Sequence, residues 1–386
     1  MANTLTGLIP TLYSALDVVS RELVGMIPSV TRDPSTDRAA VGQTVSSFVA
    51  PASTATNITP SVTPPNDGDQ TIGKKDILIT KSRRVPIRWN GEQTLGVDNN
   101  GPGQQNIQVQ QMAQAFRTLT NEVELDLCGL YVDASRAYGT AGTTPFATTL
   151  ADSAQGRKML SDNGAPVNSG MGRMVFDTAA GANLRTLGQL TKANEANDDS
   201  MLRQGVLLDL HGFELRESGQ IQTAAAGTGA SATTDAAGYA VGATTITLAS
   251  AGTGTIVAGD VITFAGDANK YVVESGDTDV SDGGTITLAA PGLRVAITTS
   301  ATAITVIAAA ARNMAFTENA IVLASRMPAL PNGGDLAVDR MTMVDDRSGL
   351  AFEIAVYEQY RQLQYEVSLA WGVKTIKPEH LVLLLG

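Results

Sequence analysis

The chain has 386 residues, of which 43% are hydrophobic and 17% are charged, and its formal net charge is −11 at pH 7. An acidic chain is not built to grip phosphates along its length, because that would need clustered Lys and Arg. Its single cysteine, Cys128, excludes an intrachain disulfide, no window reaches the roughly 20 apolar residues of a membrane-spanning helix, and residues 1–10 lack the features of a signal peptide.

The first 70 residues are predicted to form a short helix and an extended arm. Apolar residues from Leu12 to Met26 recur at helical spacing, and Pro28 ends the pattern. Residues 27–70 are rich in Pro, Ser, Thr, Asn and Asp and cannot bury a core of their own. We therefore expect this stretch to extend away from the body of the protein.

Residues 71–103 are rich in Lys and Arg, and their apolar and polar residues alternate in a pattern typical of a β-hairpin. We expect this segment to form an extended loop. A β-prone run is expected over 76–80, a turn over 81–83 and a second strand that begins near Val85, which Pro86 confines to a sheet edge. The basic residues predict either a solvated face or a surface that docks on an acidic neighbouring copy of the chain. The candidate intersubunit contacts are Lys74, Lys75, Lys81, Arg83, Arg84, Arg88 and Trp89.

A single long helix is predicted from Ile107 to about Ala137, within a segment spanning 104–140. Its apolar residues step by three and four, and about 30 helical residues would span roughly 45 Å. Cys128 falls inside this pattern and is interpreted as a small core residue, because nothing nearby in the sequence would lower its pKa. The stepping residues are Val109, Met112, Phe116, Leu119, Val123, Leu127 and Leu130.

Residues 141–221 have a mixed α/β pattern. A strand over 172–176 is followed by a helix for which Asp177 is a suitable N-cap, and a strand-like pattern surrounds His211. The chain's two histidines, His211 and His380, have no cysteine or carboxylate cluster at ligand spacing, so we interpret both as structural.

The composition shifts to Ala, Gly and Thr over 222–310, where six short strands predict an inserted antiparallel β-barrel or sandwich. Residues 257–275 read as a hairpin. The acidic loop 276–284 superficially resembles a calcium loop but carries Asp282 where glycine is required, so we expect an exposed tip whose deletion leaves the insert folded. Its candidate contact residues are Asp277, Asp279 and Asp282.

Residues 311–386 return to a mixed pattern and close with a strong β region. A hairpin is predicted around residues 345–349, with Phe352, Ile354 and Val356 on one face. Alternation from Leu363 to Trp371 predicts a half-buried antiparallel strand, and a final strand ends the chain.

In this order the parts resemble the major capsid, or coat, protein of tailed bacteriophages, which has the Hong Kong 97-type fold. The resemblance is carried by "KKDILITKSRRVPIRWN", by the long helix and by "NMAFTENAIVLASRMPALP", and the opening "ANTLTGLIPTLYSALDVVSRELVGMIPSVTRD" is similar to that family's N-terminal arm. The insertion places the chain near the P-twenty-two-like branch. The resemblance implies an α+β fold with an N-terminal arm, an extended loop, a spine helix, peripheral and axial domains split over 141–221 and 311–386, and the inserted β domain.

The resemblance further implies a function as a shell subunit. Such proteins self-assemble as pentamers and hexamers into an icosahedral shell around double-stranded DNA, typically with a scaffolding protein and a portal. The implied location is the virion capsid, assembled in the bacterial host cytoplasm. No catalytic residue, metal or cofactor is expected, and no membrane association. A capsid decoration or fibre protein, and the shell protein of a cellular encapsulating compartment, stay as alternatives.

Overall fold

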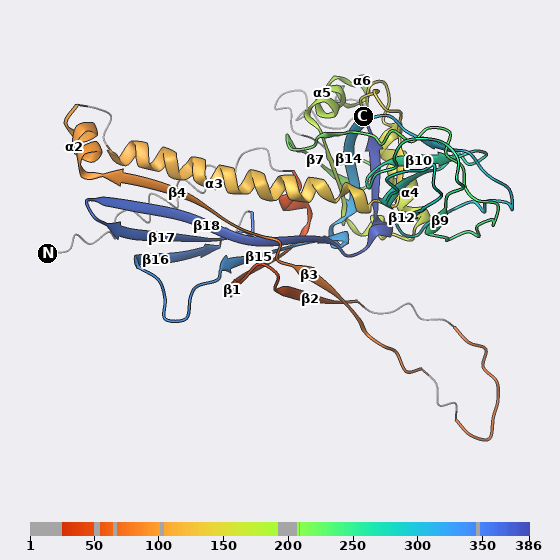
Figure 1. The fold of residues 1–386 in the computed structure, drawn as a ribbon, viewed down its shortest axis with the longest axis horizontal. Helices are drawn as coiled ribbons and strands as arrows, with labels where there is room; N and C mark the ends of the chain where they lie inside the picture. Colours follow the sequence, from red (N-terminus) through yellow and green to blue (C-terminus); the bar gives the residue numbers. More distant parts are fainter. Residues whose placement is uncertain are drawn as a thin grey trace.

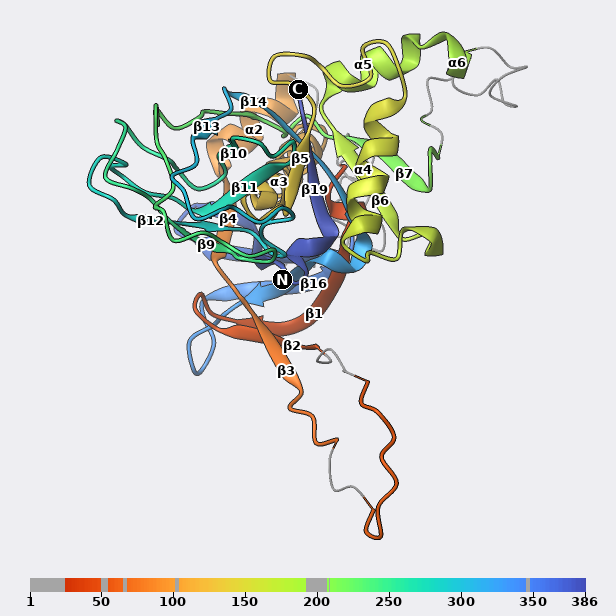
Figure 2. The same ribbon diagram turned by 90° about the vertical axis from the view of Figure 1, so that its right-hand side faces the viewer.

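The computed structural model describes residues 25–49, 55–64, 68–100, 104–191, 207, 209–344 and 348–386. They form an elongated sheet-and-helix part, a compact end that carries the C-terminus, and an arm that leaves the body (Figures 1 and 2). This architecture confirms the mixed α+β class. The helix predicted from Leu12 lies almost wholly outside the described residues. Among the described residues, no helix is both long and apolar enough to cross a membrane.

A six-stranded sheet and one long helix build the elongated part. Strand β18 pairs with β4 on one side and with β17 and β15 on the other, β16 and β1 follow outward, and helix α3 lies along the sheet (Figure 1). The elements are β1 (Thr31–Ala39), β4 (Lys81–Asn90), α2 (Gly91–Asn100), α3 (Gln104–Cys128), β15 (Ile321–Pro328), β16 (Ala337–Val344), β17 (Ala351–Gln359) and β18 (Gln362–Thr375).

Alternating side chains position this sheet against α3. Tyr365, Val367, Leu369 and Trp371 of β18 are buried in one core with the apolar face of the helix, as the alternation predicts. Phe116 of α3 meets Phe352 of β17 edge to face, with ring centroids 5.2 Å apart. The predicted strands over 351–373 are therefore confirmed.

The predicted helix is too long at its C-terminal end. Helix α3 ends at Cys128, the 3₁₀ turn η2 (Gly129–Asp133) follows, and β5 (Arg136–Tyr138) has begun before Ala137. Glycine costs about 1 kcal/mol in a helix interior, which favours an end at Gly129. β5 also gains partners that a helix could not use, because it pairs with both β19 and β11.

An eleven-stranded sheet forms the compact end. Its main path runs β13-β10-β11-β5-β19-β14-β6-β7, with β8, β9 and β12 beside it. The strands are β6 (Gly172–Phe176), β7 (Phe213–Glu217), β8 (Thr223–Ala224), β9 (Thr245–Thr247), β10 (Val261–Phe264), β11 (Lys270–Ser275), β12 (Thr285–Leu288), β13 (Ile304–Val306), β14 (Ala310–Thr317) and β19 (Leu381–Leu385). The short helices are η1 (Ile27–Ser29), α4 (Ala151–Asp162), η3 (Val167–Ser169), α5 (Thr178–Thr186), α6 (Gly188–Thr191), η4 (Glu318–Ala320) and η5 (Pro378–His380).

The inserted β region has its own buried core but shares the large sheet. β10 and β11 form the predicted hairpin, with Ile262 opposite Tyr271. Two similar sequences, TITLASAG from Thr245 and TITLAAPG from Thr285, contribute the neighbouring antiparallel strands β9 and β12. β11 also pairs with β5 through Tyr271 and Arg136, so the sheet continues from the insert into the body.

The hairpin predicted within 71–103 does not form. β3 (Gly73–Leu78) pairs instead with β2 (Thr44–Val49), and β4 pairs with β18 along its whole length. Ile87 and Trp89 explain this pairing, because they are buried in the core under α3 and could not be buried in an isolated hairpin. As Pro86 predicts, β4 has no strand on its second edge among the described residues.

The extended arm is likewise shorter than predicted. β1 lies within the predicted arm, yet it pairs in parallel with β15 and so belongs to the body. The described parts of the real arm are β2, β3 and residues 55–64 and 68–72 between them.

Candidate intersubunit surface

The arm presents apolar side chains that the described part of the chain does not cover. Phe48 on β2 is 76% exposed and Ile72, just before β3, is 66% exposed. All described residues of the connection, 55–64 and 68–72, are exposed, among them Ile58 and Val62. Figures 1 and 2 both show the arm projecting beyond the body. An exposed apolar arm of this kind is a typical protein contact element.

The base of the arm, by contrast, is anchored in the body. Ile77 and Ile79 are buried with Ala324 and Ala370 in a small cluster on the six-stranded sheet. Lys374 of β18 donates to the Asp76 carbonyl at 2.9 Å. Gly372 lies so close to the arm that an added Cβ would stand 2.0 Å from the Leu78 carbonyl oxygen. These contacts therefore fix the base of the arm to the body.

Several predicted contact residues are used within the chain. Lys81 bonds both Asp126, at 2.8 Å, and Glu122, at 3.1 Å, on α3. Burial alone would lower the pKa of Lys81, but the two carboxylates outweigh it and raise that pKa. Arg83 also pairs with Glu122, at 3.2 Å. These contacts fasten β4 to the spine helix.

Other predicted contacts differ in what they leave exposed. Arg84 pairs with Glu366 of β18 at 2.6 Å but keeps 60% of its side chain exposed. Trp89 is buried and donates from Nε1 to Gln111 at 2.9 Å, so little of it is left for another chain. Lys74 pairs with Asp76 at 3.5 Å on the arm.

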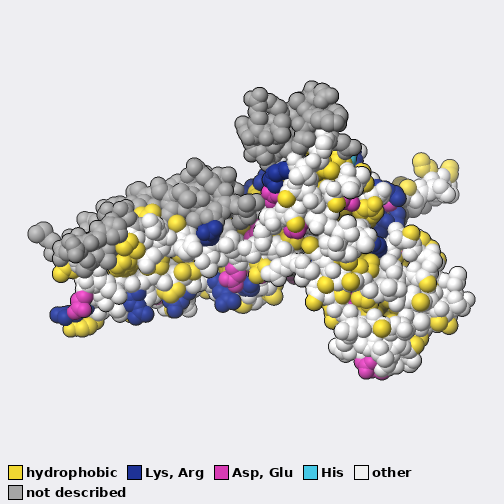
Figure 3. Space-filling model, turned by 90° about the horizontal axis from the view of Figure 1, so that it is seen from above, with side chains coloured by type: hydrophobic (Ala, Val, Ile, Leu, Met, Phe, Trp, Pro, Cys, Tyr) yellow, Lys and Arg dark blue, Asp and Glu magenta, His cyan; other side chains and the backbone are white. Residues whose placement is uncertain are grey.

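Lys75 and Arg88 are exposed, and the described part of the chain offers neither side chain an ion pair. Seen from the α3 side, Lys and Arg side chains recur along one edge of the elongated part, whereas the insert is mainly uncharged (Figure 3). Two surfaces are best suited to contact another chain: the exposed apolar arm, and the basic edge formed by the edge strand β4, whose basic residues are Lys81, Arg83, Arg84 and Arg88.

The acidic loop 276–284 is not a free tip, contrary to the prediction. Val280, at its centre, is fully buried in the core of the insert, and its N–H donates to Gly254. The loop is also held locally, because Asp279 accepts from the Ser281 hydroxyl at 2.6 Å, and these bonds lower the pKa of Asp279. Asp279 and Asp282 face solvent, and Asp277 is half-buried.

The two histidines lie in separate structural settings. His211 Nδ1 lies 2.9 Å from the hydroxyl of Ser153, an arrangement that, among the described residues, resembles a nucleophile and its base. The Ser153 hydroxyl also lies 2.9 Å from the Leu150 carbonyl, so that carbonyl and the imidazole compete for its single proton. Burial lowers the pKa of His380, which lies 3.4 Å from the Thr317 hydroxyl. Within the described ranges, no group of three potential metal ligands converges.

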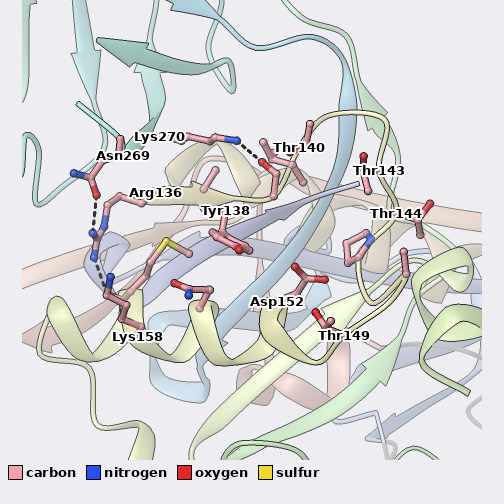
Figure 4. Close-up of a pocket in the computed structure, with 18 of the residues that line it drawn as sticks. Arg136, Tyr138, Thr140, Thr143, Thr144, Thr149, Asp152, Lys158, Asn269 and Lys270 are labelled. Carbon is pink, nitrogen blue, oxygen red and sulfur yellow. Dashed lines mark hydrogen bonds between the residues drawn. The ribbon is translucent and has the colours of Figure 1, made fainter. Parts of the chain in front are cut away.

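A polar cavity of about 500 Å³ lies where the insert meets the body. Figure 4 shows Asn269 and Lys270 reaching it from the insert, Arg136 from β5, and Asp152 and Lys158 from α4. Arg136 donates to Asn269 at 3.3 Å and to the Met159 carbonyl at 2.9 Å, and Lys270 donates to the Gly139 carbonyl. These bonds tie the insert to the body, and the cavity's cations are largely committed to them.

Sequence reasoning missed the contact that fixes the N-terminal part of the chain. Glu124 of α3 is fully buried and accepts the backbone N–H groups of Gly25, Met26 and Ile27, together with the Ser218 hydroxyl. The sequence feature that could have indicated this contact is a glutamate within the apolar pattern of the helix, between Val123 and Leu127.

Comparisons with known proteins give structural likenesses alone. No family model matches the chain, and no curated protein matches it. A chain of Mycobacterium phage Che8 is 12% identical, with a TM-score of 0.48, over 89% of this chain and 84% of its own. The capsid structure of cyanophage P-SCSP1u is 10% identical, with a TM-score of 0.47, over 92% and 86%.

A virus-like particle from Pyrococcus furiosus is also similar, at 10% identity and a TM-score of 0.42, over 99% of this chain and 100% of its own. All three similarities have TM-scores below 0.5 and identities of 12% or less. At this distance the likeness says nothing about what this chain binds. Membership of the P-twenty-two-like branch stays a prediction.

Proposed function

We propose that the chain is a self-assembling shell subunit, the major capsid protein of a tailed bacteriophage. The observation that carries the proposal is the arm, which leaves the body with Phe48 and Ile72 exposed and has no covering partner among the described residues. Exposed apolar side chains on a projecting strand pair gain free energy only when a second surface covers them. A neighbouring copy of the chain supplies that surface in a closed assembly.

The shell proposal includes pentamers and hexamers, with a scaffolding protein and a portal as partners and double-stranded DNA as the enclosed cargo. The net charge of −11 supports this part, since an acidic lining does not hold packed DNA tightly. The basic edge that includes Arg88 is then available for acidic neighbouring subunits. The proposed location is the virion capsid, after assembly in the host cytoplasm.

We also propose that the role is structural and not enzymatic. The serine–histidine pair offers weak support for nucleophile activation, because the Leu150 carbonyl competes with the imidazole for the one proton of the Ser153 hydroxyl. Arg136 and Lys270 line the 500 Å³ cavity, and their hydrogen bonds connect the insert with the body. The geometry of these residues therefore favours a scaffold for assembly over a reaction site.

Electron microscopy and analytical ultracentrifugation of the purified chain, alone and co-expressed with candidate scaffolding proteins, test the proposal. Closed particles of uniform size are expected, and persistent monomers under every condition would contradict it. Nucleic acid inside the particles favours a capsid, whereas a co-purifying enzyme cargo would favour the compartment alternative. Binding of the monomeric full chain to a glycan array would favour the fibre or decoration alternative.

A further inference from the structure

Arg312, in β14, is a buried cation whose side chain has no hydrogen-bond partner among the described residues. Its residue is 2% exposed, and none of its three side-chain nitrogen atoms has a hydrogen-bond partner among the described residues. A guanidinium carries five N–H donors and stays charged, so an unpaired one is expensive to bury. A site of this kind calls for an acceptor that the described part of the chain does not supply.

The nearest groups do not neutralise Arg312. The ring of Tyr131 lies 6.0 Å from the guanidinium carbon, which provides a weak cation–π contact. Asp260 is the neighbouring carboxylate, yet its two oxygens accept the backbone N–H groups of Gly227, at 2.9 Å, and Val257, at 2.8 Å. Asp260 is therefore committed to holding two loops of the insert.

A cavity of about 230 Å³ adjoins Arg312, between the end of α3 and the segment that leads into the insert. Arg312 is its one charged lining residue in the described part of the chain, and no carboxylate lines it. The exposed residues Gln222 and Thr223 at its rim connect it to solvent. The other lining residues are Leu125, Cys128, Gly129, Tyr131, Gln220, Ile221, Ala224 and Ala225.

We propose that this cavity binds a small oxyanion, such as a phosphate or a carboxylate, with Arg312 as its principal donor. The volume is several times the roughly 30 Å³ that a water molecule occupies in the liquid, which leaves room for such a ligand. The guanidinium nitrogens are covered in this structure, so the proposal requires the Arg312 side chain to shift toward the cavity when a ligand binds. The lining amides of Gln220 and Gln222 supply further N–H donors. This proposal is independent of the shell function.

Thermal unfolding of the full chain in increasing inorganic phosphate tests the site, with sodium chloride at matched ionic strength as the reference. The wild-type Tm should rise with phosphate beyond the chloride reference, and Arg312→Met should lose that rise. Without phosphate, Arg312→Met should be at least as stable as wild type, because removing an unpaired buried charge is often neutral or stabilising. Sodium acetate as a second arm distinguishes a preference for carboxylate from one for phosphate.

A second variant separates ligand binding from folding. Leu125→Trp fills the cavity from α3, leaves the charge of Arg312 in place and should also abolish the phosphate-dependent rise. Lys158→Met removes an exposed cation elsewhere and should keep the rise. No rise in wild type beyond chloride, or an equal rise in Arg312→Met, would overturn the proposal.

Discussion

Glu124 of α3 accepts the backbone N–H of Met26 at 2.7 Å, a contact between residues 98 positions apart. The same carboxylate accepts from Gly25 at 2.7 Å and from Ile27 at 2.9 Å, so it satisfies the N–H groups at the start of η1 and just before it. The hydroxyl of Ser218, just beyond β7, is its fourth donor at 2.7 Å. One side chain thus joins the N-terminal segment, the spine helix and the compact end.

Replacing Glu124 by Ala should destabilise the protein severely. Each buried donor left without an acceptor costs about 1–3 kcal/mol, and four donors lose theirs together. Urea denaturation should show that the free energy of unfolding falls by at least about 3 kcal/mol. Glu122→Ala on the same helix is the control. The ion pairs of Glu122 are partly exposed, so Glu122→Ala should lower the free energy of unfolding by about 1 kcal/mol. Equal losses for the two variants would contradict the role assigned to Glu124.

The sequence predicts the parts of this fold that local patterns govern. Alternation of apolar and polar residues located β17 and β18, because each buries one face against α3. Asp177 was recognised as an N-cap because capping involves neighbouring residues, and it accepts from the Ala180 N–H at 3.1 Å.

Long-range pairing explains what the sequence could not predict. β2 and β3 are separated by residues 50–72, so no short turn signal predicts their pairing. The local pattern predicts a turn over 81–83 instead. The partners of Glu124 are backbone N–H groups, which leave no trace in residue types. Arg312 reads as an ordinary residue of a strand until its surroundings are known. The intersubunit role of the basic residues was predicted from charge alone and stays a prediction.

Val280 provides a test of the corrected acidic loop. Its side chain is fully buried in the core of the insert, so Val280→Ala should cost about 1–3 kcal/mol of unfolding free energy. Deleting residues 276–284 should disrupt the insert, which is the opposite of what the sequence suggested. Circular dichroism and chemical denaturation report both effects. Asp282→Asn, on the exposed part of the loop, should leave stability within about 0.5 kcal/mol of wild type.

Tyr271 should make stability depend on alkaline pH. Burial and the bond to Asp267, at 2.6 Å, raise the pKa of Tyr271 to about 12, above its ordinary value of about 10. The unfolded chain loses the phenol proton first as pH rises, so this residue's contribution to stability falls between about pH 10 and 12. Tyr271→Phe removes that dependence.

The Tyr271→Phe difference has a defined sign. At pH 8 the variant should be about 1–3 kcal/mol less stable, because the Arg294 N–H loses its acceptor and Asp267 its donor. The gap should narrow at pH 11, as measured by urea denaturation at each pH. A gap that widens with pH would refute the assignment. Tyr360→Phe, at a residue 88% exposed, controls for the loss of a surface hydroxyl.

The arm should matter for assembly and not for folding. Phe48→Ser and Ile72→Ser together remove apolar surface that the described chain leaves exposed, so Tm should stay within about 2 °C of wild type. Particle yield should fall at least tenfold by sedimentation. Val241→Ser, at a residue of the insert that is 61% exposed, is the matched control and should assemble normally. Normal particle yield from the double variant would remove the main support for the arm as a contact.

The basic residues of the arm and of the basic edge are best tested where the described chain gives them no ion pair. Arg83→Glu or Arg84→Glu would place a carboxylate beside Glu122 or Glu366, so a loss of assembly in either variant could come from altered folding. Lys75→Glu and Arg88→Glu avoid this conflict, since both side chains are exposed and unpaired within the described chain. We expect them to keep the wild-type Tm, to slow assembly and to make its rate less sensitive to salt. If light scattering shows assembly at the wild-type rate, with the same salt dependence, the basic edge does not dock on an acidic neighbour.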